Sequence, residues 1–126
     1  MAISNGMAVT ISTPENSITT LGRRTFVKYR ELGVTEATQR KMRAQVMSCD
    51  PGSQQPTGWH FHLCDMRFLY MTSGWLELEI EGRGLVRFNK GDSVLLPGGT
   101  VHQEVDYPDD MQLVEISVPA DMGTQR

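Results

Sequence analysis

The sequence has no long hydrophobic run, little cysteine and no excess of basic residues, and each shortage excludes a class of protein. No stretch approaches the roughly 20 apolar residues of a transmembrane helix, so no membrane partner is expected. The formal net charge is -3 with both signs scattered along the chain, which argues against a nucleic-acid partner. The two cysteines, Cys49 and Cys64, are expected to be free thiols in a reducing, cytoplasmic compartment.

The 126 residues of the chain are enough for one domain with its own core. Three segments are expected: a flexible N-terminal arm over 1–22, a barrel domain over 23–120 and a C-terminal tail over 121–126. The arm is rich in Ser, Thr, Asn and Gly. It lacks the basic start and apolar run of a secretory signal, so a cytoplasmic protein is expected.

Short apolar segments separated by turn residues predict an all-β domain. In 75–81, Leu76, Leu78 and Ile80 alternate with three glutamates, so the aliphatic side chains share one face of a strand. Further strands are expected at 25–32, 41–49, 85–88, 93–96, 101–105 and 111–118. Segment 33–40 can form at most a short helical turn. Many short strands at regular spacing favour an antiparallel sandwich or barrel.

The chain has three histidines, and two of them form the sequence His60-Phe61-His62. Residues two apart on a strand point to the same face, about 6.5–7 Å apart. Two such imidazoles can bind one divalent ion at N–metal distances of about 2.0–2.1 Å. A lone His-x-His sequence is more often structural, but Trp59 and Leu63 flank this one, so it is not a solvated polar tract.

The third histidine, His102, follows turn residues that can carry it towards the other two. Gly91-Asp92 suits a tight turn at a strand entry, and Pro97-Gly98-Gly99 turns the chain again before His102. The spacing thus permits His60, His62 and His102 to be candidate metal ligands.

These residues resemble the two motifs of the cupin family. The second motif, G-x5-P-x-G-x2-H-x3-N, is matched by Gly91, Pro97, Gly99 and His102, with Asp106 in place of the asparagine. The first, G-x5-H-x-H-x3,4-E-x6-G, is matched in part by His60, His62 and Gly74. The motifs cover roughly residues 58–105, and the strand pattern extends the resemblance to most of the chain after residue 25. The resemblance implies a single jelly-roll β-barrel, a three-histidine metal site and a homodimer.

Two positions depart from the first motif. Gln54 stands where the motif has its first glycine, and Arg67 stands where it has its glutamate. Because arginine stays protonated and does not ligate metals, three histidines remain, an arrangement that resembles some cupin dioxygenases. Three neutral ligands leave a divalent ion (Fe, Mn, Ni or Zn) with its full charge and open positions. Such an ion favours an anionic substrate, an activated water or dioxygen.

Arg67 and Glu104 are the candidate catalytic residues. Arg67 either enters the pocket and binds a substrate carboxylate through two N–H groups, or turns outward to pair with surface acids. Glu104 lies two residues after His102 and so shares its inward face on a regular strand. It is a candidate general base, ligand anchor or fourth ligand, unless it is a hydrated carboxylate at the barrel mouth. Cys64 and Asp65 could also ligate a metal, but a buried thiol and a turn carboxylate are the simpler interpretation.

Three functions stay open on this sequence. The first is a metalloenzyme acting on a small anionic organic molecule, with dioxygenation ranked ahead of isomerase or lyase chemistry. The second is a non-catalytic barrel that binds or senses a small-molecule ligand. The third, a metal-free interaction barrel, would leave three histidines on ligand positions without a reason, and it ranks last.

Overall fold

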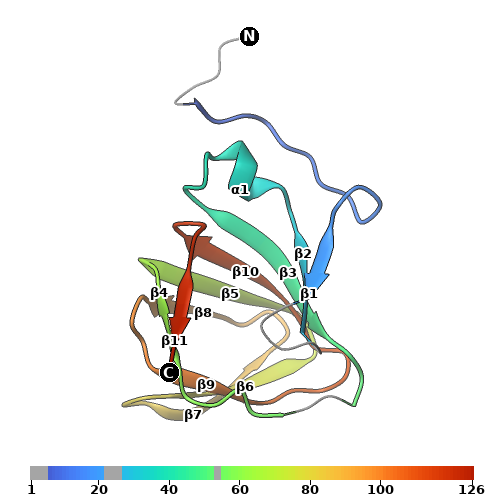
Figure 1. The fold of residues 1–126 in the computed structure, drawn as a ribbon. Helices are drawn as coiled ribbons and strands as arrows, with labels where there is room; N and C mark the ends of the chain where they lie inside the picture. Colours follow the sequence, from blue (N-terminus) through green and yellow to red (C-terminus); the bar gives the residue numbers. More distant parts are fainter. Residues whose placement is uncertain (1–5, 22–26, 53–54) are drawn as a thin grey trace.

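One large antiparallel β-sheet faces two smaller ones across a barrel in the computed structural model, which describes residues 6–21, 27–52 and 55–126 (Figure 1). The larger sheet has the strand order β1-β2-β3-β10-β5-β8. Its strands are β1 (Thr19–Leu21), β2 (Val27–Glu31), β3 (Arg43–Cys49), β10 (Gln112–Val118), β5 (Met66–Ser73) and β8 (Ser93–Pro97). Gln54, residues 1–5 of the predicted arm and the first residues of the strand predicted at 25–32 lie outside the described ranges.

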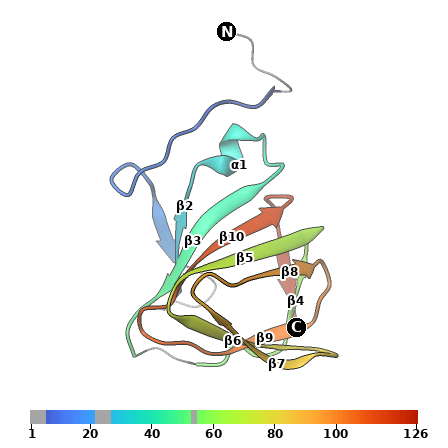
Figure 2. The ribbon, with the colours of Figure 1, turned by 180° about the vertical axis from the view of Figure 1, so that it is seen from behind.

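The opposite wall consists of two smaller sheets. One has the order β7-β6-β9 and the other pairs β11 with β4. Their strands are β7 (Gly84–Asn89), β6 (Trp75–Ile80), β9 (His102–Asp106), β11 (Gly123–Gln125) and β4 (Phe61–Leu63). An isolated bridge between His60 and His102 joins the two, and each backbone N–H donates to the other residue's carbonyl at 2.9 Å. Figure 2 shows the larger sheet running above β6, β7 and β9. The expected all-β jelly-roll barrel is confirmed.

Aliphatic side chains from both walls form the core. The alternation predicted in β6 is confirmed, because Leu76, Leu78 and Ile80 are 1%, 0% and 7% exposed. Met71 from β5 and Leu113 from β10 are buried in the same cluster. Full burial of one such side chain contributes about 1.5–3 kcal/mol, so this cluster supplies the main stabilisation of the barrel.

The predicted strands agree with the observed ones to within about two residues at each described end. The predicted helical turn is α1 (Val34–Ala37), and no helix of the described residues is long and apolar enough to cross a membrane. The sequence does not predict β1, β5 or β11. β1 lies within the segment expected to be an arm and pairs with β2, while β11 lies within the segment expected to be a tail and pairs with β4.

Candidate metal centre

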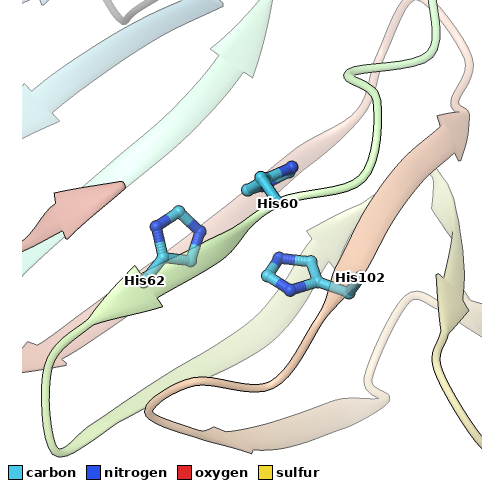
Figure 3. Close-up of side chains that lie close together, drawn as sticks. All are labelled: His60, His62 and His102. Atoms are coloured by element: carbon cyan, nitrogen blue, oxygen red, sulfur yellow. The ribbon is translucent and has the colours of Figure 1, made fainter. Parts of the chain in front are cut away.

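The three histidines converge inside the barrel (Figure 3). His62 lies on β4, His60 at the bridge just before it, and His102 at the start of β9. One ring nitrogen from each residue lies within 4.8 Å of the other two. The residues are 3%, 9% and 1% exposed for His60, His62 and His102. Side chains separated by up to 42 positions of sequence therefore meet at one buried point.

The turn after β8 holds β4 and β9 together. The Gly99 N–H donates to the His62 carbonyl at 3.1 Å, and Gly99 has a φ of 81°, which glycine adopts without strain. A Cβ on Gly98 would collide with the carbonyl oxygen of Cys64. The two glycines therefore let the turn approach the strand that carries His62, immediately before the chain reaches His102.

Backbone carbonyls orient two of the imidazoles. Nδ1 of His60 lies 2.6 Å from the Gly58 carbonyl oxygen, and Nδ1 of His102 lies 2.8 Å from that of Thr100. Since a carbonyl oxygen only accepts hydrogen bonds, each Nδ1 carries the hydrogen, and the neutral ring presents its lone pair on Nε2. Burial lowers the pKa of His102 below its usual value, which favours this neutral form.

The last strand orients the third imidazole. Thr124 pairs with His62 across the β4–β11 register, and its Oγ1 lies 2.9 Å from the His62 Nδ1. A hydroxyl can donate or accept, so this contact fixes the ring's direction without fixing its tautomer. The segment predicted to be a tail thus contributes a contact to a candidate ligand.

Glu104 faces the histidines from β9 and is 6% exposed. Its Oε2 lies 3.6 Å from the His60 Nε2, and its Oε1 lies 4.0 Å from the His102 Nε2. The Thr57 hydroxyl donates to Oε2 at 2.6 Å and accepts from the Glu104 N–H at 2.9 Å. Burial alone would raise the pKa of Glu104, but the Arg67 guanidinium, His102 and the Thr57 hydroxyl outweigh burial and lower it. Glu104 is therefore a buried carboxylate.

This donor set fits a divalent transition metal. Imidazole nitrogen and carboxylate oxygen are ligands that Fe, Mn, Ni and Zn all accept, so the donors do not select one of them. The Glu104 carboxylate and the Nε2 lone pairs of His60 and His102 repel each other at 3.6–4.0 Å. A cation between these groups turns that repulsion into attraction.

Arg67 is buried inside the barrel, at 4% exposure, rather than turned outward. Its Nη2 donates to Oε2 of Glu115 at 2.7 Å, and its Nη1 lies 3.4 Å from the His102 Nε2. Burial alone would lower the pKa of Arg67, but Glu115 and Glu104 raise it above its usual value. Its Nε is buried and has no hydrogen-bond partner among the described residues. A charged guanidinium with an unused donor therefore stands beside the histidine cluster.

The site opens into a cavity of about 280 Å³. It is lined by Val27, Tyr29, Arg43, Gln45, Met47, Thr57, His60, His62, Arg67, Glu104, Glu115, Met122 and Thr124. A volume of this order suits a small organic molecule. Cys64 and Asp65 are not among the described residues that line it, so the geometry favours the simpler interpretation of both, although Cys64 is only partly buried.

The charged residues of the cavity balance one another. Arg43 and Arg67 contribute two positive charges, and Glu104 and Glu115 contribute two negative charges. A divalent ion on the histidines leaves a net excess of two positive charges in a largely buried space. This electrostatic field favours an anionic ligand.

Four of the five candidate residues from the sequence line this one cavity: His60, His62, Arg67 and Glu104. The fifth, His102, lies beside it, with its Nε2 3.4 Å from the Arg67 Nη1. Sequence reasoning missed Tyr29, Gln45, Thr57, Glu115 and Thr124. Two of these had a signal. Gln45 and Glu115 stand at positions of apolar strands whose neighbours two residues away point inward, where an uncompensated polar group is costly.

Comparison with known proteins identifies the fold. No model of a known protein family matches the chain, and no curated protein sequence matches it. Among solved structures, the chain is similar to the polyketide cyclase RemF from Streptomyces resistomycificus, with 16% identity and a TM-score of 0.75 over 94% of this chain and 85% of that one. It is also similar to KdgF from Halomonas sp., with 17% identity and a TM-score of 0.70 over 89% of this chain and 94% of that one.

A third similar structure is a mutant salicylate 1,2-dioxygenase from Pseudoaminobacter salicylatoxidans in complex with gentisate. It has 10% identity and a TM-score of 0.66 over 84% of this chain but only 30% of the dioxygenase. At these identities the likeness concerns the fold. The chain has the cupin fold, a double-stranded β-helix, with a three-histidine group inside it.

Proposed function

We propose that this protein is a mononuclear metalloenzyme that acts on a small organic anion, with dioxygenation as the first-ranked reaction. One observation carries the proposal: the three imidazoles converge beside a buried carboxylate and a buried guanidinium. A histidine cluster with a purely structural role needs neither the carboxylate nor the guanidinium. Burying them together is costly unless their charges are used by each other or by a ligand.

In this proposal, His60, His62 and His102 hold the ion through three ring nitrogens, and Glu104 lies close enough to serve as a fourth ligand or as a base. The bound ion would supply Lewis acidity and, if it is redox-active, electron transfer. Arg67 would bind a substrate carboxylate through its Nε, which has no hydrogen-bond partner among the described residues. The remaining wall, from Val27 and Met47, would exclude water from the carbon skeleton.

Dioxygenation ranks first because three neutral ligands leave open positions for both an organic anion and dioxygen. The fold similarity to a salicylate dioxygenase supports this ranking without extending its substrate to this chain. The native metal in that case would be iron or another redox-active ion. Oxygen consumption in the presence of a panel of small aromatic and aliphatic carboxylates measures this directly.

Isomerase or lyase chemistry is the second candidate, and Glu104 is the observation that favours it. The Glu104 carboxylate could take a proton from a substrate carbon, and an ion held by the histidines would supply the Lewis acidity that acidifies this carbon. Thr57 would keep the carboxylate oriented through its hydroxyl. Exchange of substrate C–H for deuterium in D2O without oxygen consumption identifies this reaction.

The test of the metal site is elemental analysis of the purified protein and of a His60→Ala/His102→Ala double variant. The wild-type protein should carry about one transition-metal ion per chain, and the double variant almost none. If both stay empty after incubation with Fe(II), Zn(II), Mn(II) and Ni(II), the metalloenzyme proposal is wrong. If metal binds without turnover of any carboxylate in the panel, the non-catalytic binding or sensing barrel takes its place.

A homodimer in the cytoplasm remains part of the proposal. Exposed apolar side chains on the outer face of the larger sheet, Met66 at 42%, Tyr70 at 44% and Leu95 at 54%, support association through that face. Sedimentation or light scattering of the purified protein measures the mass in solution, and a monomer at micromolar concentration would contradict this part.

A further inference from the structure

Arg43 contributes a second guanidinium to the cavity, and its charge is only partly used. Its Nη2 lies 3.7 Å from Oε1 of Glu115, which is longer than a hydrogen bond. Its Nε is buried and has no hydrogen-bond partner among the residues that the structure describes. Arg43 therefore holds unused donors beside the proposed substrate site.

Glu115 cannot neutralise both arginines. Its Oε2 accepts from Arg67 at 2.7 Å, and its Oε1 accepts from Gln45 at 3.1 Å. Each carboxylate oxygen thus accepts one short hydrogen bond from another residue, and Arg43 makes only the longer contact. The second acid of the cavity, Glu104, is bound by Thr57 and faces the histidines instead.

Arg43 also lies at the boundary between the inner cavity and a second, outer hollow. Its side chain is 25% exposed, whereas that of Arg67 is 4% exposed. It lines the inner cavity, and it also lines a second hollow of about 570 Å³ between residues 10–18, α1 and the start of β3. The two guanidiniums thus follow one another from the histidine cluster outward, on either side of one carboxylate.

We infer that the cavity is built for a small organic dianion, with one anionic group at the histidine cluster and Arg67 and the other at Arg43. This inference rests on the proposed function and names its substrate class. It also agrees with the charge balance, because two negative charges compensate the excess that a divalent ion creates. Arg43 is the specificity-determining residue in this assignment, since a monoanion does not reach it.

The experiment compares ligands that differ by one carboxylate. Succinate and butyrate, followed by malonate and glutarate, are titrated by calorimetry into the Zn(II)-loaded protein and into the metal-free protein. The wild-type protein should bind its best dicarboxylate about ten-fold or more tightly than butyrate, because a second charged, hydrogen-bonded contact is made. The best chain length reports the separation of the two anionic groups.

Variants separate the two guanidiniums. Arg43→Gln should remove the preference for the dicarboxylate and leave butyrate affinity unchanged, and Arg43→Lys should retain part of it. Arg67→Gln should weaken both ligands. Arg83→Gln, which changes an exposed arginine in the turn between β6 and β7, is the matched control and should change neither. Thermal unfolding of each variant verifies that it is folded. If Arg43→Gln does not fold, Arg43→Lys provides the comparison instead.

The outcomes are distinct from those of the metal test. Equal binding of butyrate and of the best dicarboxylate to the wild-type protein, or an equal loss of both in Arg43→Gln, overturns the dianion assignment and leaves the metalloenzyme proposal standing. Absence of metal overturns the metalloenzyme proposal, while a dicarboxylate preference that depends on Arg43 in the metal-free protein still supports the dianion site. Absence of binding by every carboxylate overturns the dianion site.

Discussion

His62 and Thr124 are joined by a contact of 2.9 Å between the imidazole Nδ1 and the hydroxyl Oγ1, so the last strand of the chain orients a candidate metal ligand. Strand β11 is only three residues long and pairs with β4 alone. The site therefore depends on a segment with little packing of its own, and this dependence can be measured.

Thr124→Val should lower metal affinity by about 10- to 100-fold, the usual effect of losing a partner that orients a metal-bound imidazole. Thr124→Ser keeps the hydroxyl and should stay close to the wild type. Competition with a chromogenic chelator gives the dissociation constant for Zn(II). Thr72→Val removes the hydroxyl of a partly buried residue on β5, which donates to the Gln112 carbonyl, and it serves as the control. An unchanged affinity in Thr124→Val would show that β11 does not support the site.

The buried pair of Arg67 and Glu115 should behave non-additively in a double-mutant cycle. Arg67→Met leaves Glu115 with only the longer contact to Arg43, and Glu115→Gln leaves the Arg67 charge without its short partner. Each should lower the free energy of unfolding by about 3–5 kcal/mol. The double variant should lose clearly less than the sum of the two, because no buried charge of the pair remains. Urea unfolding of the four proteins measures this, and strictly additive losses would argue against a buried ion pair.

Glu104→Gln separates the charge of this side chain from its shape. The amide can keep a hydrogen bond with Thr57, so the variant should fold. Its metal affinity should fall by at least about ten-fold if the carboxylate neutralises the ion, because a buried, charge-assisted contact is lost. Glu81→Gln, in the exposed turn after β6, is the control. Metal affinity equal to the wild type would restrict Glu104 to a role in proton transfer.

The buried Cys49 should make stability depend on alkaline pH. Burial raises the pKa of its thiol from 9.0 to about 11. Between these values the unfolded chain releases a proton that the folded chain retains, so the free energy of unfolding falls as pH rises and its full value is present below pH 9. In a Cys64→Ala background, urea unfolding should show this loss relative to Cys49→Ala/Cys64→Ala. Parallel stability curves from pH 8 to 11 would contradict it.

The sequence predicts the fold well where local chemistry decides it. The alternation of Leu76, Leu78 and Ile80 with glutamates sets the inner face of β6, and the turn Pro97-Gly98-Gly99 precedes His102 as expected. The three candidate ligands could be named because the histidines stand at the ligand positions of the cupin motifs that the sequence resembles, and their spacing permits them to bind one ion.

The surroundings of those ligands could not be predicted in the same way. The sequence does not determine the direction of Arg67, because its partner Glu115 lies 48 positions away and comes from a different strand. Thr124 gave no signal either, since a three-residue strand has no periodicity to detect. Both contacts arise only when the barrel closes, and closure is a property of the whole chain.

The bridge between His60 and His102 has a consequence for how the ion can be exchanged. Their paired backbone hydrogen bonds, both 2.9 Å, fix the spacing of two ligands by the main chain rather than by the ion. A protein built in this way stays folded when stripped of metal, in contrast to small zinc domains that unfold. Dialysis against a chelator should therefore yield a folded apoprotein that can bind a different ion. The metal supply of the cell would then decide which reaction the protein catalyses.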